Sequence, residues 1–209
     1  MSRKKYLNIV RHYESCLKKH GDTHLGVNWP RAKEIDLRHQ VMLEVIKEKK
    51  DKKIKLLDFG CGTSALYEYI KKKKLNNIIY SGLDLSEEFI KIAKNKFPKN
   101  KYYCLDILTD YKKLPIFNYI VLSGVFTQKR DLTQKEMFAF FKKMINRVFS
   151  KAKNGIAFNL LPKQVDYEKK ESFYLSFDKL ANFLVKEVSR NFIIRNDYGL
   201  WEYTTYVYK

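Results

Sequence analysis

The chain has 209 residues and a formal net charge of +19, with 45% hydrophobic and 15% aromatic residues. This length suits one compact domain, and the apolar and aromatic content excludes an intrinsically disordered chain. The three cysteines lack a paired spacing, so neither a disulfide framework nor a zinc knuckle is indicated, and no signal peptide or membrane anchor is recognisable. We therefore expect one cytoplasmic domain over residues 1–209.

The predicted elements begin with two helices. Apolar residues recur at helical spacing over residues 3–20 and 32–50, on either side of the polar loop 21–30. Beyond residue 54, short apolar runs alternate with amphipathic segments, which predicts strands at 54–59, 78–83, 101–105, 117–122 and 155–160 and helices at 64–73, 86–96 and 132–149. A helix over 176–190 and two strands, 191–196 and 202–209, complete the chain.

This order predicts an α/β fold with a Rossmann-like doubly wound sheet. Alternating strands and helices give a mostly parallel sheet with helices on both faces. Only residues 197–201 join the last two strands, too few for a parallel crossover, so we expect a C-terminal antiparallel hairpin. Residues 1–50 are expected to form an N-terminal helical cap or lid, and residues 51–209 the α/β core.

The stretch LLDFGCGTSA, residues 56–65, ends the first predicted strand in a glycine-rich turn. Nicotinamide, flavin and S-adenosylmethionine sites all use such turns, so the pattern alone does not discriminate among them. Asp58 does, because a carboxylate beside the turn would repel a pyrophosphate and favour a ligand with an ammonium and a sulfonium. The sequence therefore favours a cationic ligand.

Acidic residues also follow the next two predicted strands. Asp84 ends the second strand, where a carboxylate can accept hydrogen bonds from ribose hydroxyls. Asp106 follows the third strand, where it can accept from an adenine amino group while Ile107 packs on the ring. The fourth strand leads into Ser123, Gly124 and Phe126, at the switch point beside the first strand.

The segments LLDFGCGTS, IIYSGLDLS, YYCLDIL and FNYIVLSGVF resemble the class I S-adenosylmethionine-dependent methyltransferases, and the resemblance spans residues 54–209. It implies that the glycine turn holds the methionine portion of S-adenosylmethionine, Asp84 the ribose, and Asp106 the adenine. Two positions depart from the family pattern: Ser64 replaces the third glycine, and Asn118 stands where the fourth strand often begins with aspartate. The expected cofactor-binding residues are Trp29, Arg38, Asp58, Gly60, Cys61, Gly62, Asp84, Leu85, Asp106, Ile107, Ser123, Gly124 and Phe126.

The loop 21–30 is expected to close over the cofactor as a lid, with Trp29 covering it and Arg38 reaching its carboxylate. The block HGDTHLGVNWP also resembles the front end of small stand-alone bacterial methyltransferases that modify surface carbohydrate or related small metabolites. The histidines of this region lack a convincing set of metal-ligand partners, so no metal is expected. No general base is identified; the candidates are His20, His24, Tyr198 and Glu202.

The positions of the basic residues bear on the acceptor. Dense lysine groups, such as 47–53 and 71–74, precede predicted strands, so they are expected at the edge of the sheet opposite the site. Five basic residues follow strands and could receive a phosphate or carboxylate: Lys129, Arg130, Lys163, Lys169 and Lys170.

We therefore expect methyl transfer to an oxygen or nitrogen of a small acceptor, including anionic ones that contain a phosphate or a sugar. The sequence has no N-P-P-Y and no P-C dipeptide, which weighs against adenine-N6 and cytosine-C5 chemistry. The alternatives are an RNA or protein methyltransferase, a non-catalytic cofactor-binding domain, and, more distantly, a nicotinamide oxidoreductase. The sequence does not predict the oligomeric state.

Overall fold

The computed structural model describes residues 5–48 and 51–209. It contains a seven-stranded sheet in the order β3-β2-β1-β4-β5-β7-β6. The strands are β1 (Ile54–Phe59), β2 (Ile78–Asp84), β3 (Lys101–Cys104), β4 (Phe117–Leu122), β5 (Ala152–Leu160), β6 (Phe192–Arg195) and β7 (Tyr203–Tyr208). The first five are parallel, whereas β7 runs antiparallel to both β5 and β6. The predicted Rossmann-like sheet with its C-terminal hairpin is confirmed.

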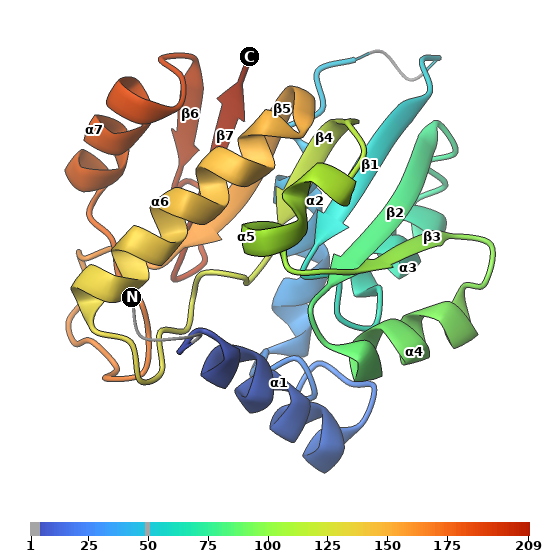
Figure 1. Cartoon of the computed structure of the whole chain (residues 1–209), viewed down its shortest axis with the longest axis horizontal. Coiled ribbons are helices and arrows are strands. Elements are labelled where there is room, and N and C mark those ends of the chain that lie inside the picture. The colour runs from blue at the N-terminus through green and yellow to red at the C-terminus, as the bar shows by residue number, and fades with distance from the viewer. Residues whose placement is uncertain (1–4, 49–50) are drawn as a thin grey trace.

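Helices cover both faces of this sheet (Figure 1). They are α1 (Leu7–His20), α2 (Ile35–Leu43), α3 (Ala65–Lys72), α4 (Glu87–Lys96), α5 (Ile107–Asp110), α6 (Gln134–Ser150) and α7 (Phe177–Glu187). Alternate residues of the central strands point to opposite faces, as Leu56 and Leu57 do in β1. Leu57 lies in the core beneath α6 and α7, and Leu56 in the core beneath α2 and α3.

Helix α1 lies across one edge of the sheet rather than on a face (Figure 1). The carboxyl ends of the parallel strands lie here, so α1 covers the region where an open α/β sheet binds its ligands. The chain terminus after β7 lies at the opposite edge (Figure 1).

Some element bounds differ from the predicted ones. The second helix begins as a 3-10 turn at 32–34 and continues as α2 only to Leu43. Residues 49–50 of its predicted span, which also belong to the lysine group 47–53, lie outside the described residues. Residues 3–4 of the predicted first helix also lie outside them. Strand β5 begins at Ala152 rather than 155, because it pairs with β4 from Phe117 onward. The short helix α5 was not predicted.

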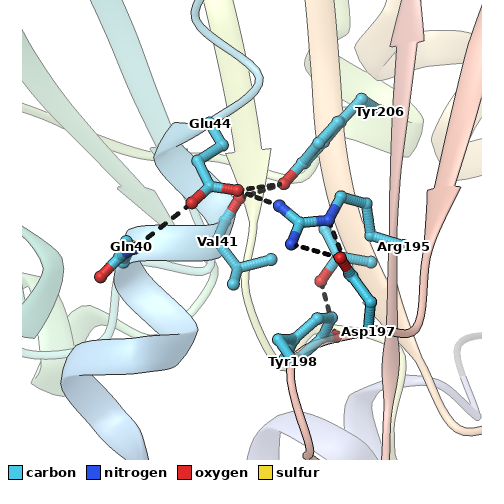
Figure 2. A network of polar contacts seen from close by, with 8 residues as sticks. Gln40, Val41, Glu44, Arg195, Asp197, Tyr198 and Tyr206 are labelled. Carbon is cyan, nitrogen blue, oxygen red and sulfur yellow. Dashed lines mark hydrogen bonds and ion pairs between the residues drawn. The ribbon is translucent and has the colours of Figure 1, made fainter.

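Polar contacts join α2 to the C-terminal hairpin (Figure 2). The Tyr206 hydroxyl donates to the backbone carbonyl of Val41 at 2.6 Å. Glu44, which follows α2, forms an ion pair with Arg195 at the end of β6. Asp197 also orients Arg195, with 2.7 Å between Nε and Oδ1. These contacts fix α2 against strands that are distant in sequence.

Candidate functional site

A cavity lies at the carboxyl ends of β1, β2 and β4, closed by α1 and by the loop before α2. Eleven of the thirteen residues expected to bind the cofactor line it: Trp29, Asp58, Gly60, Cys61, Gly62, Asp84, Leu85, Asp106, Ile107, Ser123 and Gly124. Residues that are far apart in the sequence meet here because parallel strands end at the same edge of a sheet.

The backbone of the glycine turn has conformations that glycine adopts readily. Gly60 has a φ of 73°, and a Cβ there would stand 2.7 Å from the side chain of Val125. Gly124 has a φ of 76°, and a Cβ there would come within 3.2 Å of Trp29 Nε1. A side chain at Gly60, in the turn after β1, would collide with Val125, and one at Gly124, which follows β4, would crowd Trp29.

Ser64, the departure from the family pattern, has a structural explanation. It has left-handed backbone angles, φ 70° and ψ 37°, although it is not a glycine. Its side chain is fully buried, and Oγ lies 3.0 Å from the Tyr102 hydroxyl and 3.3 Å from the Tyr80 hydroxyl. The serine thus adopts a backbone conformation that glycine adopts more readily, and its hydroxyl joins a buried polar network.

Asp58 belongs to the same network. Its side chain is 3% exposed, and Oδ2 accepts a hydrogen bond of 2.9 Å from Tyr80. Burial raises the pKa of Asp58 to about 7, the negative charge of Asp84 adds to this, and the Tyr80 hydrogen bond opposes it. Because it is a buried carboxyl with a pKa near neutrality, Asp58 would become fully ionised if a cation lay beside it.

Asp84 is oriented by the backbone. Its Oδ2 accepts from the Gly62 N–H at 2.9 Å and its Oδ1 from the Ser86 N–H at 3.0 Å. Burial raises the pKa of Asp84, whereas these backbone hydrogen bonds oppose the shift. The carboxylate is thereby fixed between the glycine turn and the start of α4, with acceptor capacity remaining on both oxygens.

Asp106 lies at the far end of the cavity, after β3. Its Oδ1 accepts from the Leu108 N–H at 2.9 Å and its Oδ2 from the Tyr6 hydroxyl at 2.5 Å. Tyr6 precedes α1, so this contact attaches the covering helix to the predicted adenine end of the site. Burial and the carboxylate together raise the pKa of Tyr6, which keeps the hydroxyl protonated as a donor.

Two of the expected cofactor residues do not line the cavity. Arg38 donates from Nε to Glu202 at 2.8 Å and lies 3.6 Å from Glu34, so its guanidinium is already engaged by carboxylates. Phe126 is fully buried in the core, where its ring packs edge-on against Phe141 at 4.9 Å. Arg38 thus lies behind the lining, with its Cζ 5.0 Å from the centre of the Trp29 ring, and Phe126 lies in the core.

The four candidate bases also lie outside the lining of this cavity. His24 contacts the backbone carbonyl of Trp29, with 2.7 Å between Nδ1 and the oxygen. The Tyr198 hydroxyl lies 2.9 Å from Thr204, and Glu202 is bound by Arg38. No proton acceptor for a methyl acceptor is assigned from these residues.

Sequence reasoning did not assign several parts of the lining, among them Phe89 of α4 and Phe140 and Met144 of α6, and two further parts carry polar groups. One is formed by the inner face of α1 and by the residue before it: Tyr6, Ile9, Val10 and Tyr13. The helical spacing of these residues indicated packing but not a ligand site. The other is His39 on α2, which is 2% exposed and whose Nδ1 has no hydrogen-bond partner among the described residues. Burial lowers the pKa of His39 to about 4, Arg38 adds to the shift, and Asp36 opposes it.

The charges of the lining fit a cationic nucleoside ligand. Three carboxyl groups line the cavity, and the described residues around it include neither lysine nor arginine. Ser123 also lines the cavity, and its Oγ is buried without a partner in the described structure. No described helix has the length and apolar character to cross a membrane, and no cluster of three or more potential metal ligands occurs among the described residues.

Comparison with known proteins supports this interpretation. The family profile of the methyltransferase domain matches residues 57–147. The protein named "Putative methyltransferase Rv1506c" of Mycobacterium tuberculosis H37Rv is 26% identical over 156 residues, which are 73% of this chain and 91% of that protein.

Solved structures share the fold. Magnesium protoporphyrin IX methyltransferase from Synechocystis PCC 6803, with bound S-adenosylhomocysteine, has a TM-score of 0.68 at 14% identity, and the match covers 97% of this chain and 99% of that one. The 1,6-didemethyltoxoflavin-N1-methyltransferase of Burkholderia thailandensis has a TM-score of 0.66 at 11% identity, with coverages of 100% and 91%. The family match and the shared fold support S-adenosylmethionine-dependent methyltransferase activity for this chain.

Proposed function

We propose that this methyltransferase transfers a methyl group from S-adenosylmethionine to an oxygen or nitrogen of a small acceptor. The observation that carries the proposal is the cavity in which Asp58, Asp84 and Asp106 meet the glycine turn. When bound, S-adenosylmethionine supplies a methyl group activated by a positive sulfonium. The three carboxylates suit its cationic and hydroxyl groups, and they do not suit a pyrophosphate.

Each carboxylate has a separate proposed role. Asp58 stabilises the positive charge of the ligand near the turn. Asp84 accepts hydrogen bonds from the ribose hydroxyls, and its orientation is already set by the Gly62 N–H. Asp106 accepts from the adenine amino group while Ile107, which is buried beside it, packs on the ring.

The covering helix contributes by excluding water. Tyr13 and Tyr6 hold α1 over the cavity through Gly124 and Asp106, with the Tyr13 hydroxyl 3.3 Å from the Gly124 carbonyl. Methyl transfer is an in-line displacement, and alignment in a closed site can supply up to about 7–11 kcal/mol of the barrier reduction. The cover that α1 provides over the cavity favours a small acceptor over a long polymer.

The acceptor is proposed to include anionic molecules that carry a phosphate or a sugar, as the surface-carbohydrate resemblance of residues 20–30 suggests. Basic residues after β4 and β5 would receive its negative charge. Of these, Lys163 is already paired with Glu168, so the proposal rests on Lys129, Arg130, Lys169 and Lys170. The Synechocystis and Burkholderia enzymes are named for small-molecule substrates, which is consistent with a small acceptor for this chain.

The proposal is tested by calorimetry with S-adenosylhomocysteine, followed by transfer of a labelled methyl group to fractionated cell metabolites. Asp84→Asn should abolish binding, whereas Asp51→Asn, an exposed aspartate before β1, should not. Tight binding of NADH without S-adenosylhomocysteine binding would overturn the proposal. Binding without transfer to any fraction would favour a non-catalytic domain, and transfer to RNA or protein would replace the acceptor class.

A further inference from the structure

Basic side chains follow the whole edge of the sheet that lies opposite the cofactor cavity. At this edge the parallel strands and β6 begin, and β7 ends. Each of the seven strands has an exposed lysine or arginine there, in its first two residues or within five residues of its end. In sheet order from β3 to β6, these residues form the basic edge: Lys99, Lys101, Lys73, Lys74, Lys52, Lys53, Lys112, Lys113, Lys153, Lys209 and Arg190.

Few acidic side chains neutralise the basic edge. Among the residues that the structure describes, Lys113 is the member of this set that forms an ion pair, with Asp110 at 2.5 Å. Segments 73–77 and 97–100, which lead into β2 and β3, contain no acidic residue, and Asp51 is the exposed acid before β1. The positive charges therefore stay available to an external partner of negative charge.

The dimensions of the basic edge fit an extended negative surface rather than a small anion. Seven strands at a spacing of about 4.8 Å give it a length of about 29 Å. Strand β1, with six residues, separates it by about 20 Å from the carboxyl ends of the strands. Helix α1 and the cavity that it covers lie at that other edge (Figure 1). A partner on the basic edge is therefore distinct from the methyl acceptor.

Exposed aliphatic side chains accompany these charges. Ile79 is the second residue of β2, Ile116 directly precedes β4, and Ile193 is the second residue of β6. They are 48%, 53% and 45% exposed, respectively. Aliphatic side chains beside lysines are typical of surfaces that rest on the headgroup region of a bilayer.

Single-stranded nucleic acid fits the basic edge less well. Its bases stack on exposed aromatic rings, and arginine is the preferred cation for its phosphates. Arg190 is the one arginine of the set, and the Phe149 ring beside Lys209 is covered by the lysine ammonium, with 3.9 Å between Nζ and the ring centre. The most exposed aromatic side chains that are described, Tyr167 and Trp201, lie in the loops after β5 and before β7, at the edge of the cavity.

We propose that the basic edge docks this protein on the surface of an anionic bilayer, with the cofactor cavity facing away from the membrane. Each basic residue close to such a surface strengthens binding about fivefold. The carboxyl ends of the strands then stay open to an acceptor from solution. This inference is independent of the proposed function, because it uses no residue of the cavity.

The experiment measures co-sedimentation of the whole chain with two kinds of vesicle, one of phosphatidylcholine and phosphatidylglycerol at about 2:1 and one of phosphatidylcholine alone. The edge variant combines Lys52→Gln, Lys99→Gln and Lys112→Gln, which are exposed residues. Its affinity for the anionic vesicles should be about a hundredfold lower than that of the unmodified protein. Raising the salt from about 0.1 M to 0.5 M should also release the unmodified protein, because the Debye length shortens.

The matched control combines Lys18→Gln, Lys19→Gln and Lys33→Gln, which remove the same charge from exposed positions on α1 and in the turn before α2. It should bind the anionic vesicles as the unmodified protein does, and thermal unfolding checks that both variants are folded. The inference is overturned if both kinds of vesicle bind equally or neither binds, or if the two variants lose equal affinity. Tighter binding to single-stranded RNA than to the vesicles, lost in the edge variant, would also overturn it.

Discussion

The buried carboxyl of Asp58 predicts that cofactor binding depends on pH. The pKa of Asp58 is raised to about 7 in the free protein, so the fraction ionised increases from about one tenth at pH 6 to about nine tenths at pH 8. A cationic ligand requires the ionised form. The affinity for S-adenosylhomocysteine, which keeps the ammonium, should therefore rise about tenfold from pH 6 to pH 8 and level off above that.

The measurement is calorimetric titration with S-adenosylhomocysteine at half-unit steps from about pH 5.5 to 8.5, a range that brackets the ionisation of Asp58. His39, with a pKa of about 4, stays neutral throughout this range. Tyr80→Phe removes the hydrogen bond that favours the ionised form of Asp58, so the midpoint of the curve should move to higher pH. Asp58→Asn should bind more weakly and with no slope over the same range. An affinity that is flat in the unmodified protein, or a slope that persists in Asp58→Asn, would refute the reasoning.

Four stability measurements by chemical denaturation follow from the same buried groups. The pKa of Asp58 in the folded protein lies above its unfolded value of 3.8, so ionisation of Asp58 destabilises the fold as pH rises from about 4 to 7. Asp58→Asn should therefore be more stable than the unmodified protein at pH 8, by up to about 4 kcal/mol, and similar to it at pH 4. His39→Phe should stabilise the free protein by about 1–3 kcal/mol, since it removes a buried unpartnered nitrogen; a loss of stability would show that the imidazole has a partner in the fold. Ser64→Ala should lower the free energy of unfolding by about 1–2 kcal/mol, because Tyr80 and Tyr102 lose their contact with Oγ while the left-handed backbone remains; an unchanged value would mean that the hydroxyl is not part of the network. Glu202→Gln should lower the free energy of unfolding by about 3 kcal/mol, because Arg38 loses its nearest carboxylate. A decrease below about 1 kcal/mol would show that Glu34 takes over as the partner of Arg38.

The central strands and their acidic ends were predictable from sequence because they follow local rules. The bounds of β1 and β4 agree with the predicted ones, since short apolar runs there are followed at once by glycine or serine. Asp58, Asp84 and Asp106 could be placed together without coordinates, because strand direction alone brings successive strand ends to one edge.

The walls of the cavity were less predictable because they depend on tertiary contacts. Arg38 is bound by Glu202, which is far along the chain and could not be paired with α2 from spacing. The apolar stripe of α1 had the pattern of any packed helix, and nothing in that pattern distinguishes a core from a ligand cavity. Phe126 followed the expected strand but points into the aromatic core.

The attachment of α2 to the hairpin has a consequence for how the site forms during synthesis. Arg195, Glu202 and Tyr206 contact α2 or Glu44, the residue that follows it, and each lies at least 151 residues later in the sequence than its partner. Since chains emerge from the ribosome amino end first, the α2 wall of the cavity acquires these partners only after residues 195–206 have been made. The glycine turn and its carboxylates are therefore synthesised well before the residues that hold the α2 wall of the cavity in place.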